Sequence, residues 1–214
     1  MAWPFRSDNM TEYVITTPED GFPREMQLPW PPALQQLLDA SPSAQPLAFV
    51  VCAAACLELV RLSGVMPPAP ACAAHSLASF TAFYPRYLRE HSRISTKRCH
   101  YAGTAALLLL LLRSPALLLA IAAAAALGLA AYPWTRWMRH GALEAAAVLA
   151  AYAACSAHLG AATAAAPLLV GYGAAWVGHF FFERNRPDTF IYPTFSLFGD
   201  FRMFGEMLIG KQPL

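Results

Sequence analysis

The sequence has few charged residues and no paired cysteines, and each deficit argues against a class of protein. Charged side chains make up 13% of the 214 residues, hydrophobic ones 57%, and the mean hydropathy is +0.39. This composition argues against a soluble domain and favours a membrane protein. The five cysteines form no C-x-x-C pair. Because their number is odd and most lie within apolar runs, we expect reduced thiols and no disulfide framework.

The net charge and the missing motifs exclude further functions. A formal net charge of +2 is too small to indicate nucleic-acid binding, and the basic residues do not alternate with aromatic ones along a soluble face. The sequence contains no histidine boxes of membrane desaturases, no H-E-x-x-H, no G-x-S-x-G and no phosphate-binding glycine loop. The polar, acidic N-terminus does not resemble a secretory signal peptide, so we expect the membrane address to lie in the spans themselves.

Residues 1–75 are predicted to be an N-terminal, proline-rich arm. Its first part has no sustained apolar period, so we expect a flexible cytosolic segment with one short helix over 33–40. Residues 47–66 are apolar enough to form a membrane-associated helix. Glu58 and Arg61 make a full membrane span at this position costly.

The remainder of the chain, residues 76–214, is predicted to be an all-α, membrane-embedded domain. Apolar positions recur at helical offsets from Phe80 to His91, which places the His91 imidazole on an apolar helix face. Two further apolar helices are expected over 142–160 and 163–182, and their many alanines and glycines permit close helix packing.

The apolar run 101–131 decides the topology, because Arg113-Ser114-Pro115 interrupts it. It is either one long span, which puts His100 and His179 on opposite sides, or a hairpin of two short helices, which puts them on the same side. Basic residues favour the cytoplasmic side for all the connecting loops, and only the hairpin satisfies this. We therefore predict a multi-pass bundle of two helical hairpins, with both polar clusters and both termini facing the cytosol.

The stretch 171–211 combines an apolar helix, a dense polar cluster and an aromatic tail. Eight of the thirteen phenylalanines lie between Phe180 and Phe204. Such a pattern is typical of a membrane–water boundary, where aromatic rings settle and charged groups mark function. In the polar cluster, Arg184 and Arg186 suit the carboxylate of a lipid. Ordinary anchoring by positive charge explains both arginines at least as well.

Three histidines are candidate metal ligands: His91, His100 and His179. Glu183 follows His179 by four residues, so the two would share one helix face. Imidazoles beside a carboxylate suit non-heme Fe(II), with Zn(II) as the rival on ligand type. Glu183 would be either a ligand or the acceptor of a ring N–H. The plainer interpretation is an interfacial histidine and glutamate that cap and pair, and spacing alone does not favour a metal over it.

Two blocks of the sequence closely resemble a known family. They read FTAFYPRYLREHSRISTKRCHYAGT (80–104) and GYGAAWVGHFFFERNRPDTFIYPTFSLFGDFRMFGEMLIGK (171–211), about 65 residues together. Both are similar to the yeast-type 2-hydroxy-fatty-acid dioxygenases, small membrane proteins of phytosphingosine breakdown, and the chain is nearer their short, bacterial-like branch. An alanine-rich insertion, at about 101–165, separates the blocks.

The resemblance implies an Fe(II)-dependent enzyme of fatty-acid α-oxidation in the endoplasmic reticulum membrane. Such an enzyme uses O2 to convert a 2-hydroxy fatty acid into CO2 and the fatty acid that is one carbon shorter, without 2-oxoglutarate. The implied metal ligands are His91, His100 and His179, with Glu183 and Arg186 as catalytic neighbours. The alternatives are a non-enzymatic membrane scaffold or partner-docking protein and, less favoured, a zinc hydrolase on the same ligands. About one iron per chain would argue against the scaffold, and activity that depends on O2 would argue against the hydrolase.

Overall fold

The computed structural model describes residues 44–64, 77–138 and 140–214. The chain divides into two units, Met1–Gln36 and Leu37–Leu214, and every described residue belongs to the second unit. Most of the predicted proline-rich arm, including the short helix expected over 33–40, lies outside the described residues.

The described residues are helical throughout and contain no strand, as predicted for the fold class. In chain order the elements are α2 (Ala44–Leu62), α3 (Phe80–Glu90), α4 (Ile94–Arg113), α5 (Pro115–Thr135), α6 (Ala142–Ser156), the 3-10 turn η3 (Ala157–Leu159), α7 (Ala161–Val177), the π-helical turn η4 (Gly178–Glu183), the 3-10 turn η5 (Asp188–Phe190) and α8 (Pro193–Leu208). By length and composition, four helical segments of the described part can cross a membrane: Ala44–Leu62, Pro115–Thr135, Ala142–Leu159 and Ala161–Glu183.

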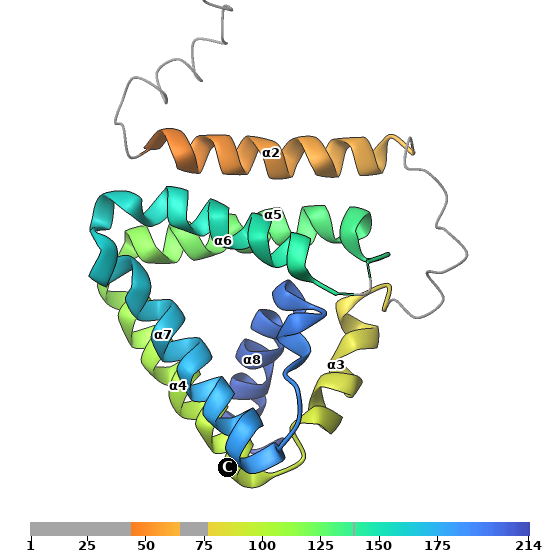
Figure 1. The fold of residues 1–214 in the computed structure, drawn as a ribbon, viewed down its shortest axis with the longest axis vertical. Coiled ribbons are helices and arrows are strands. Elements are labelled where there is room, and N and C mark those ends of the chain that lie inside the picture. The colour runs from red at the N-terminus through yellow and green to blue at the C-terminus, as the bar shows by residue number, and fades with distance from the viewer. Residues whose placement is uncertain (1–43, 65–76, 139) are drawn as a thin grey trace, which may run out of the picture. The chain divides into compact units, whose positions relative to one another are not determined.

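Two helix pairs form the centre of the fold: α5 with α6, and α4 with α7 (Figure 1). The helices α5 and α6 are consecutive and make a hairpin. Helices α4 and α7 precede and follow that hairpin, and they lie side by side. The pairing differs from the predicted hairpin within 101–131, because α4 contacts α5 little beyond their common corner and takes α7 as its partner.

Ser114 and Pro115 separate α4 from α5, as their sequence suggests. The Ser114 hydroxyl accepts a hydrogen bond from the Leu117 amide (3.4 Å), and Pro115 occupies the first turn of α5. Each of the two helices is longer than the short arms predicted. Helix α4 has 20 residues and spans about 30 Å, because it already begins at Ile94. Its polar first turns are buried, for example at Thr96, by tertiary contacts that hydropathy does not reveal.

Small residues let α4 and α7 approach closely. A Cβ atom added to Gly103 would lie 2.6 Å from the Ala174 Cβ, and one added to Gly178 would lie 3.1 Å from the Thr96 Cγ2. The Thr96 hydroxyl donates a hydrogen bond to the Gly178 carbonyl (3.2 Å). This close packing positions the ends of α4 and of the α7–η4 segment beside each other.

Helix α8 contacts α3, α4, α5 and α6 and joins the helix pairs. Its N-terminus is fixed by Glu144 of α6, a 2% exposed side chain whose carboxylate accepts a hydrogen bond from the Thr194 amide (3.0 Å). Its aromatic face packs on α3, where Phe195 lies against Phe83 and Phe80. Through these contacts α8 packs against both α3 and α4.

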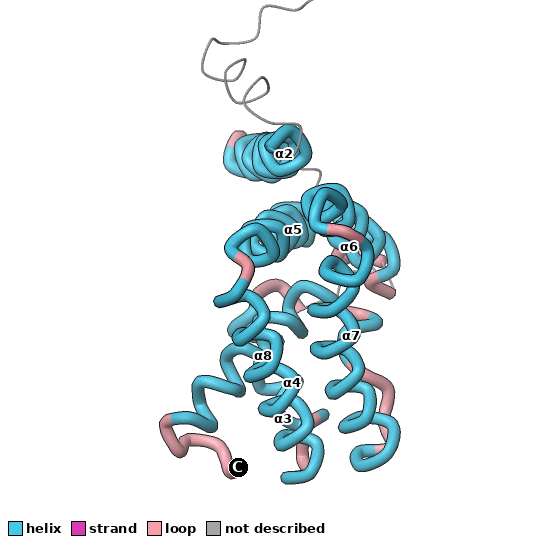
Figure 2. The backbone as a smooth tube through the Cα atoms, turned by 90° about the vertical axis from the view of Figure 1, so that its left-hand side faces the viewer, coloured by secondary structure: helices cyan, strands magenta, loops and turns pink. Residues whose placement is uncertain are grey.

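Helix α2 packs on the α5–α6 hairpin (Figure 2). It covers most of the stretch 47–66, in which a membrane-associated helix was expected. Glu58 and Arg61 form an exposed ion pair one turn apart, with 2.5 Å between Oε1 and Nη2. Mutual pairing lowers the cost of these two charges in an otherwise apolar helix.

Candidate metal centre

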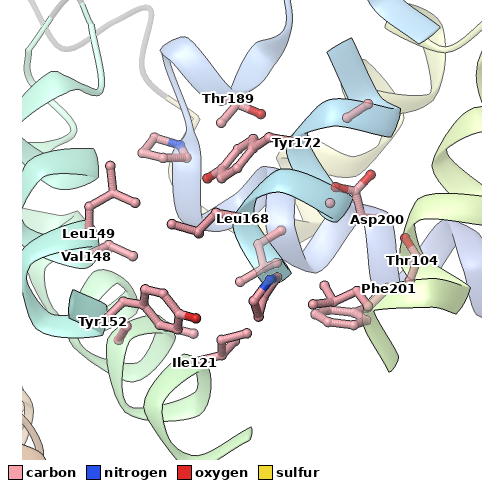
Figure 3. Close-up of a pocket in the computed structure, with 18 of the residues that line it drawn as sticks. Thr104, Ile121, Val148, Leu149, Tyr152, Leu168, Tyr172, Thr189, Asp200 and Phe201 are labelled. Carbon is pink, nitrogen blue, oxygen red and sulfur yellow. The ribbon is translucent and has the colours of Figure 1, made fainter. Parts of the chain in front are cut away.

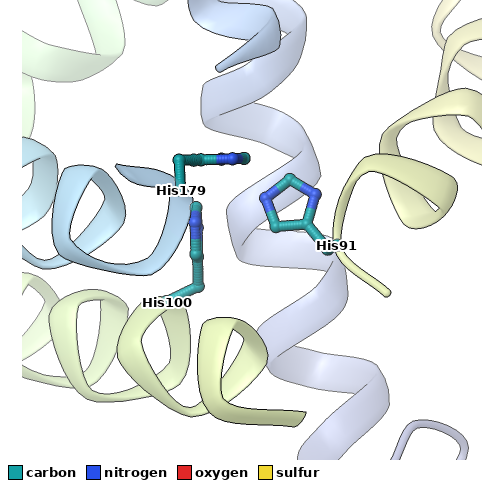
Figure 4. A group of neighbouring side chains, drawn as sticks. All are labelled: His91, His100 and His179. Carbon is teal, nitrogen blue, oxygen red and sulfur yellow. The ribbon is translucent and has the colours of Figure 1, made fainter. Parts of the chain in front are cut away.

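Three histidines from three separate elements meet in one place (Figure 4). His91 ends α3, His100 lies in the second turn of α4, and His179 lies in η4. The ring centroids are 4.4 Å apart for His91–His100, 4.6 Å for His91–His179 and 5.1 Å for His100–His179. One ring nitrogen of each lies within 4.8 Å of the other two, and all three side chains are buried. His100 and His179 thus lie at the same end of the fold, as predicted from the interrupted run 101–131. That this end faces the cytosol stays a prediction.

Every one of these rings is held by its Nδ1 atom. His91 Nδ1 lies 2.6 Å from the Tyr87 carbonyl, His100 Nδ1 lies 2.5 Å from the Asp200 Oδ1, and His179 Nδ1 lies 2.8 Å from the Asn185 Oδ1. All three partners are acceptors, so the proton is on Nδ1 and the lone pair is on Nε2. Ligating histidines in metalloproteins are commonly held in this way.

The Nε2 atoms of His91 and His100 are buried and have no hydrogen-bond partner among the described residues. An unpaired buried polar atom costs roughly 1–3 kcal/mol, which a bound cation would remove. Burial lowers the pKa of His91 to about 3, and the electrostatic effect of the neighbouring His100 acts in the same direction. This imidazole is therefore neutral and able to ligate at physiological pH. The group therefore fits a metal ion of the Fe(II) or Zn(II) type.

Asp200 and Tyr87 contact each other as well as the histidines that they hold. The Tyr87 hydroxyl donates to the Asp200 Oδ1 (2.5 Å), while the Tyr87 ring stacks on His91 with 4.0 Å between centroids. Burial opposes ionisation of Asp200, but its electrostatic interaction with His100 and the hydrogen bonds from His100 and Tyr87 outweigh this effect and lower the pKa of the carboxyl. A Cβ atom on Gly199 would lie 2.8 Å from the Tyr87 ring, so glycine at this position makes the arrangement possible.

Sequence reasoning missed Asp200, although a signal for it exists. It is a carboxylate in the middle of an aromatic, largely apolar helix, where an ionisable group is costly and therefore indicates function. Asn185 belonged to the polar cluster that the sequence singled out, but its role was not predicted. Its amide nitrogen donates to the Glu90 carbonyl (2.9 Å) and to the Glu90 Oε2 (3.0 Å), which fixes the orientation of the amide toward His179.

The π-helical turn η4 directs His179 and Asn185 toward each other. The His179 carbonyl accepts hydrogen bonds from the amides of both Arg184 and Asn185, the latter at 3.2 Å. Arg184 adopts a left-handed conformation (φ 58°), which non-glycine residues seldom adopt. Such wide turns inside helices are frequent at functional sites.

Glu183 and Arg186 lie apart from the histidine group. The Glu183 carboxylate accepts hydrogen bonds from the Arg93 amide (2.5 Å) and the Ser92 hydroxyl (3.1 Å), at the start of α4. The acceptor role considered for Glu183 is therefore filled by Asp200 and Asn185. Arg186 is exposed, with its guanidinium 5.0 Å from the centroid of the Phe190 ring. Catalytic roles for Glu183 and Arg186 stay predictions.

An apolar cavity lies beside the histidine group and is lined by one of its members, His100; Figure 3 shows Asp200 and the apolar side chains around it. Its empty volume is about 880 Å³, open space at its mouth included. His100 and Asp200 belong to its wall, and the rest of the lining comes mainly from apolar residues of α4, α5, α6, α7 and α8. A mainly apolar lining with few polar groups is typical of binding sites for small molecules.

Fold and site together define a class: a protein whose described residues form helices, four of them candidate membrane spans, in which three buried histidines lie beside an apolar cavity. The family model Mpo1-like, described as 2-hydroxy-palmitic acid dioxygenase Mpo1-like, matches residues 77–212, and the chain belongs to this family. This confirms the resemblance noted from the two sequence blocks. The match includes all three histidines and Asp200, whereas α2 precedes it. No curated protein and no solved structure matches the chain.

Proposed function

We propose that this protein is an Fe(II)-dependent dioxygenase that converts a 2-hydroxy fatty acid into CO2 and the fatty acid that is one carbon shorter. The family description supports the substrate class and the use of O2. The observation that carries the proposal is the group of three buried histidines, two of them (His91 and His100) with unpaired Nε2 atoms, beside an apolar cavity.

The proposed reaction balances without an added reductant. R–CH(OH)–COOH and O2 give R–COOH, CO2 and H2O, as the bond between C1 and C2 breaks. C2 becomes a carboxyl carbon and C1 leaves as CO2, so the substrate itself supplies all four electrons that O2 takes up. Iron held by His91, His100 and His179 would supply the activation of O2, which protein side chains alone do not provide.

The chain's own groups would prepare this chemistry in two ways. The acceptors on Nδ1 fix each imidazole with Nε2 toward the common centre, so that little reorientation is needed when a metal binds. Three protein ligands leave positions open, unlike the four of a structural site. The apolar cavity beside His100 would hold the hydrocarbon chain and exclude water.

A non-enzymatic scaffold accounts less well for the histidine group. Buried imidazole nitrogens without partners would lower the stability of a scaffold and add no contact to it. As to location, we propose the endoplasmic reticulum membrane from the family resemblance, with the histidine end toward the cytosol from the distribution of basic residues. Membrane lipid would then surround the candidate spans.

The experiment measures O2 uptake by the anaerobically purified, Fe(II)-loaded protein after addition of 2-hydroxypalmitate. We expect uptake with release of CO2 and a fifteen-carbon fatty acid, loss of both in His179→Ala, and normal uptake in His158→Ala, which changes an exposed histidine of η3. Iron-loaded protein that takes up no O2 with this substrate would contradict the proposal. Turnover without O2 by a zinc form would favour the hydrolase.

A further inference from the structure

The cavity follows one stripe of α4 and one of α7, leading away from the histidines. On α4 the lining residues after His100 are Thr104 and Leu107, four and seven residues later. On α7 they include Ala175, Gly171 and Leu168, which lie four, eight and eleven residues before His179; Tyr172 and Pro167 also line the cavity. These spacings keep one helix face in line, so the cavity is a passage between the helices with the metal centre at one end.

The far end of the passage is closed by a packed cluster. Tyr152 is 4% exposed there, and its hydroxyl donates to the Ala164 carbonyl (2.7 Å), which fixes the ring between α6 and α7. Leu107 belongs to the same cluster, and Ile121 and Leu168 pack against it. The passage therefore ends on packed, largely apolar side chains.

The depth of the passage matches a membrane acyl chain. Eleven helical residues separate Leu168 from His179, which corresponds to about 16 Å along the helix axis. The hydrocarbon core of a bilayer is about 30 Å thick, so the chains of one leaflet extend about 15 Å. A long-chain fatty acid with its head at the histidines would thus end near Leu168 and Tyr152.

Gly171 has no packing reason to be a glycine. A Cβ atom added there would meet only Leu107 Cδ2, at an ordinary 3.9 Å, whereas one added to Gly103 would collide with Ala174. A glycine inside a helix costs about 1 kcal/mol relative to alanine. Because Gly171 lines the cavity about halfway along α7, the missing side chain keeps the passage open.

We propose that this passage holds the acyl chain of the 2-hydroxy fatty acid, that Gly171 leaves room for the chain, and that Leu168 and Tyr152 at the floor set the preferred chain length. This inference rests on the proposed function for the identity of the head group. We infer a single unbranched chain as occupant, because the lining beyond Asp200 is mainly apolar: its polar groups are the hydroxyls of Thr104, Tyr172 and Thr189 and that of Tyr152, which already donates to the Ala164 carbonyl.

The test compares Gly171→Leu with Gly173→Leu, a matched control. Both changes put leucine into α7, but Gly173 is exposed and a Cβ atom there meets nothing within 4 Å. The purified full chain is loaded with a fluorescent fatty acid, which is displaced by 2-hydroxy acids of eight to eighteen carbons. This readout needs no turnover.

We expect Gly171→Leu to weaken binding of the sixteen-carbon acid at least tenfold and that of the eight-carbon acid less than threefold. Gly173→Leu should match the wild type. An unchanged profile in Gly171→Leu, or equal weakening for all lengths, would overturn the proposal. If Gly171→Leu fails to fold, Gly171→Ala decides, with a loss of about threefold expected for the long acid alone.

The same measurement separates this inference from the proposed function. Selective binding of long chains without O2 uptake would support the acyl passage and contradict the dioxygenase. Normal O2 uptake with an unchanged chain-length profile in Gly171→Leu would contradict the passage and leave the dioxygenase in place.

Discussion

Replacing Asp200 with asparagine changes the charge beside His100 and little else. The carboxylate accepts one hydrogen bond from the His100 Nδ1 and one from the Tyr87 hydroxyl, each at 2.5 Å. An amide has the same shape, but its single oxygen carries no full charge and is the weaker acceptor for both donors. His100 would therefore be less firmly oriented and less basic at Nε2.

The expected size of the effect follows from the contacts. Removing an outer partner of a metal ligand typically costs 10–100-fold in metal affinity. Asp200 is the only carboxylate among the three acceptors, and hydrogen bonds to ionised groups are roughly twice as strong as neutral ones. We therefore expect Asp200→Asn to weaken Fe(II) binding by about 30–100-fold, or about 2–2.8 kcal/mol.

The assay is anaerobic competition for Fe(II) between the protein and a chromogenic chelator. Glu206→Gln is the matched control, because Glu206 lies on the same helix and its carboxylate bonds Tyr84 (2.8 Å) and Arg202 (3.0 Å) instead of a histidine. A dissociation constant for Asp200→Asn within threefold of the wild type would refute the role of Asp200 in orienting His100 as a metal ligand. An equal loss in Glu206→Gln would refute it as well.

Two further predictions concern stability. Gly199→Ala forces a Cβ atom to within 2.8 Å of the Tyr87 ring and should lower the free energy of unfolding by about 1–3 kcal/mol. Gly205→Ala on the same helix is the control, because its Cβ atom meets nothing within 4 Å. Equal melting temperatures of the two variants would contradict the prediction. Glu183→Ala removes the acceptor of the Arg93 amide at the start of α4 and should cost about 0.5–2 kcal/mol. Its Fe(II) affinity should stay within twofold of the wild type. A loss of turnover beyond the loss of folded protein would support the predicted catalytic role of Glu183 instead.

The helices and the three histidines were accessible from sequence because their signals are local. Apolar runs give the helices, and a titratable ring on an apolar helix face, as at His91, is unusual enough to be noticed. The role of Asp200 is not local. It depends on α8 folding back onto α4, which joins residues one hundred positions apart.

The expected common helix face of His179 and Glu183 and the expected helix pairing depended on assumptions that the fold does not meet; the catalytic role of Glu183 stays a prediction. The four-residue spacing from His179 to Glu183 brings two side chains together only in a regular α-helix, but the chain follows a π-helical turn there. Helix α4 packs on α7, where Gly103 fits closely against Ala174. Such a fit between two helix surfaces cannot be inferred from which helices are neighbours in the sequence.

The α5–α6 hairpin joins α4 and α7 at the end that lies away from the histidines. The histidines and the groups that hold them all lie outside this hairpin: Tyr87 and His91 before it, His100 on α4, and Asn185 and Asp200 after it. The hairpin does supply part of the cavity floor, through Ile121 and Tyr152. Substitutions at these two floor positions would therefore reshape the cavity without touching a group that holds a histidine, whereas Glu144 of the same hairpin holds α8, and with it Asp200, through the Thr194 amide.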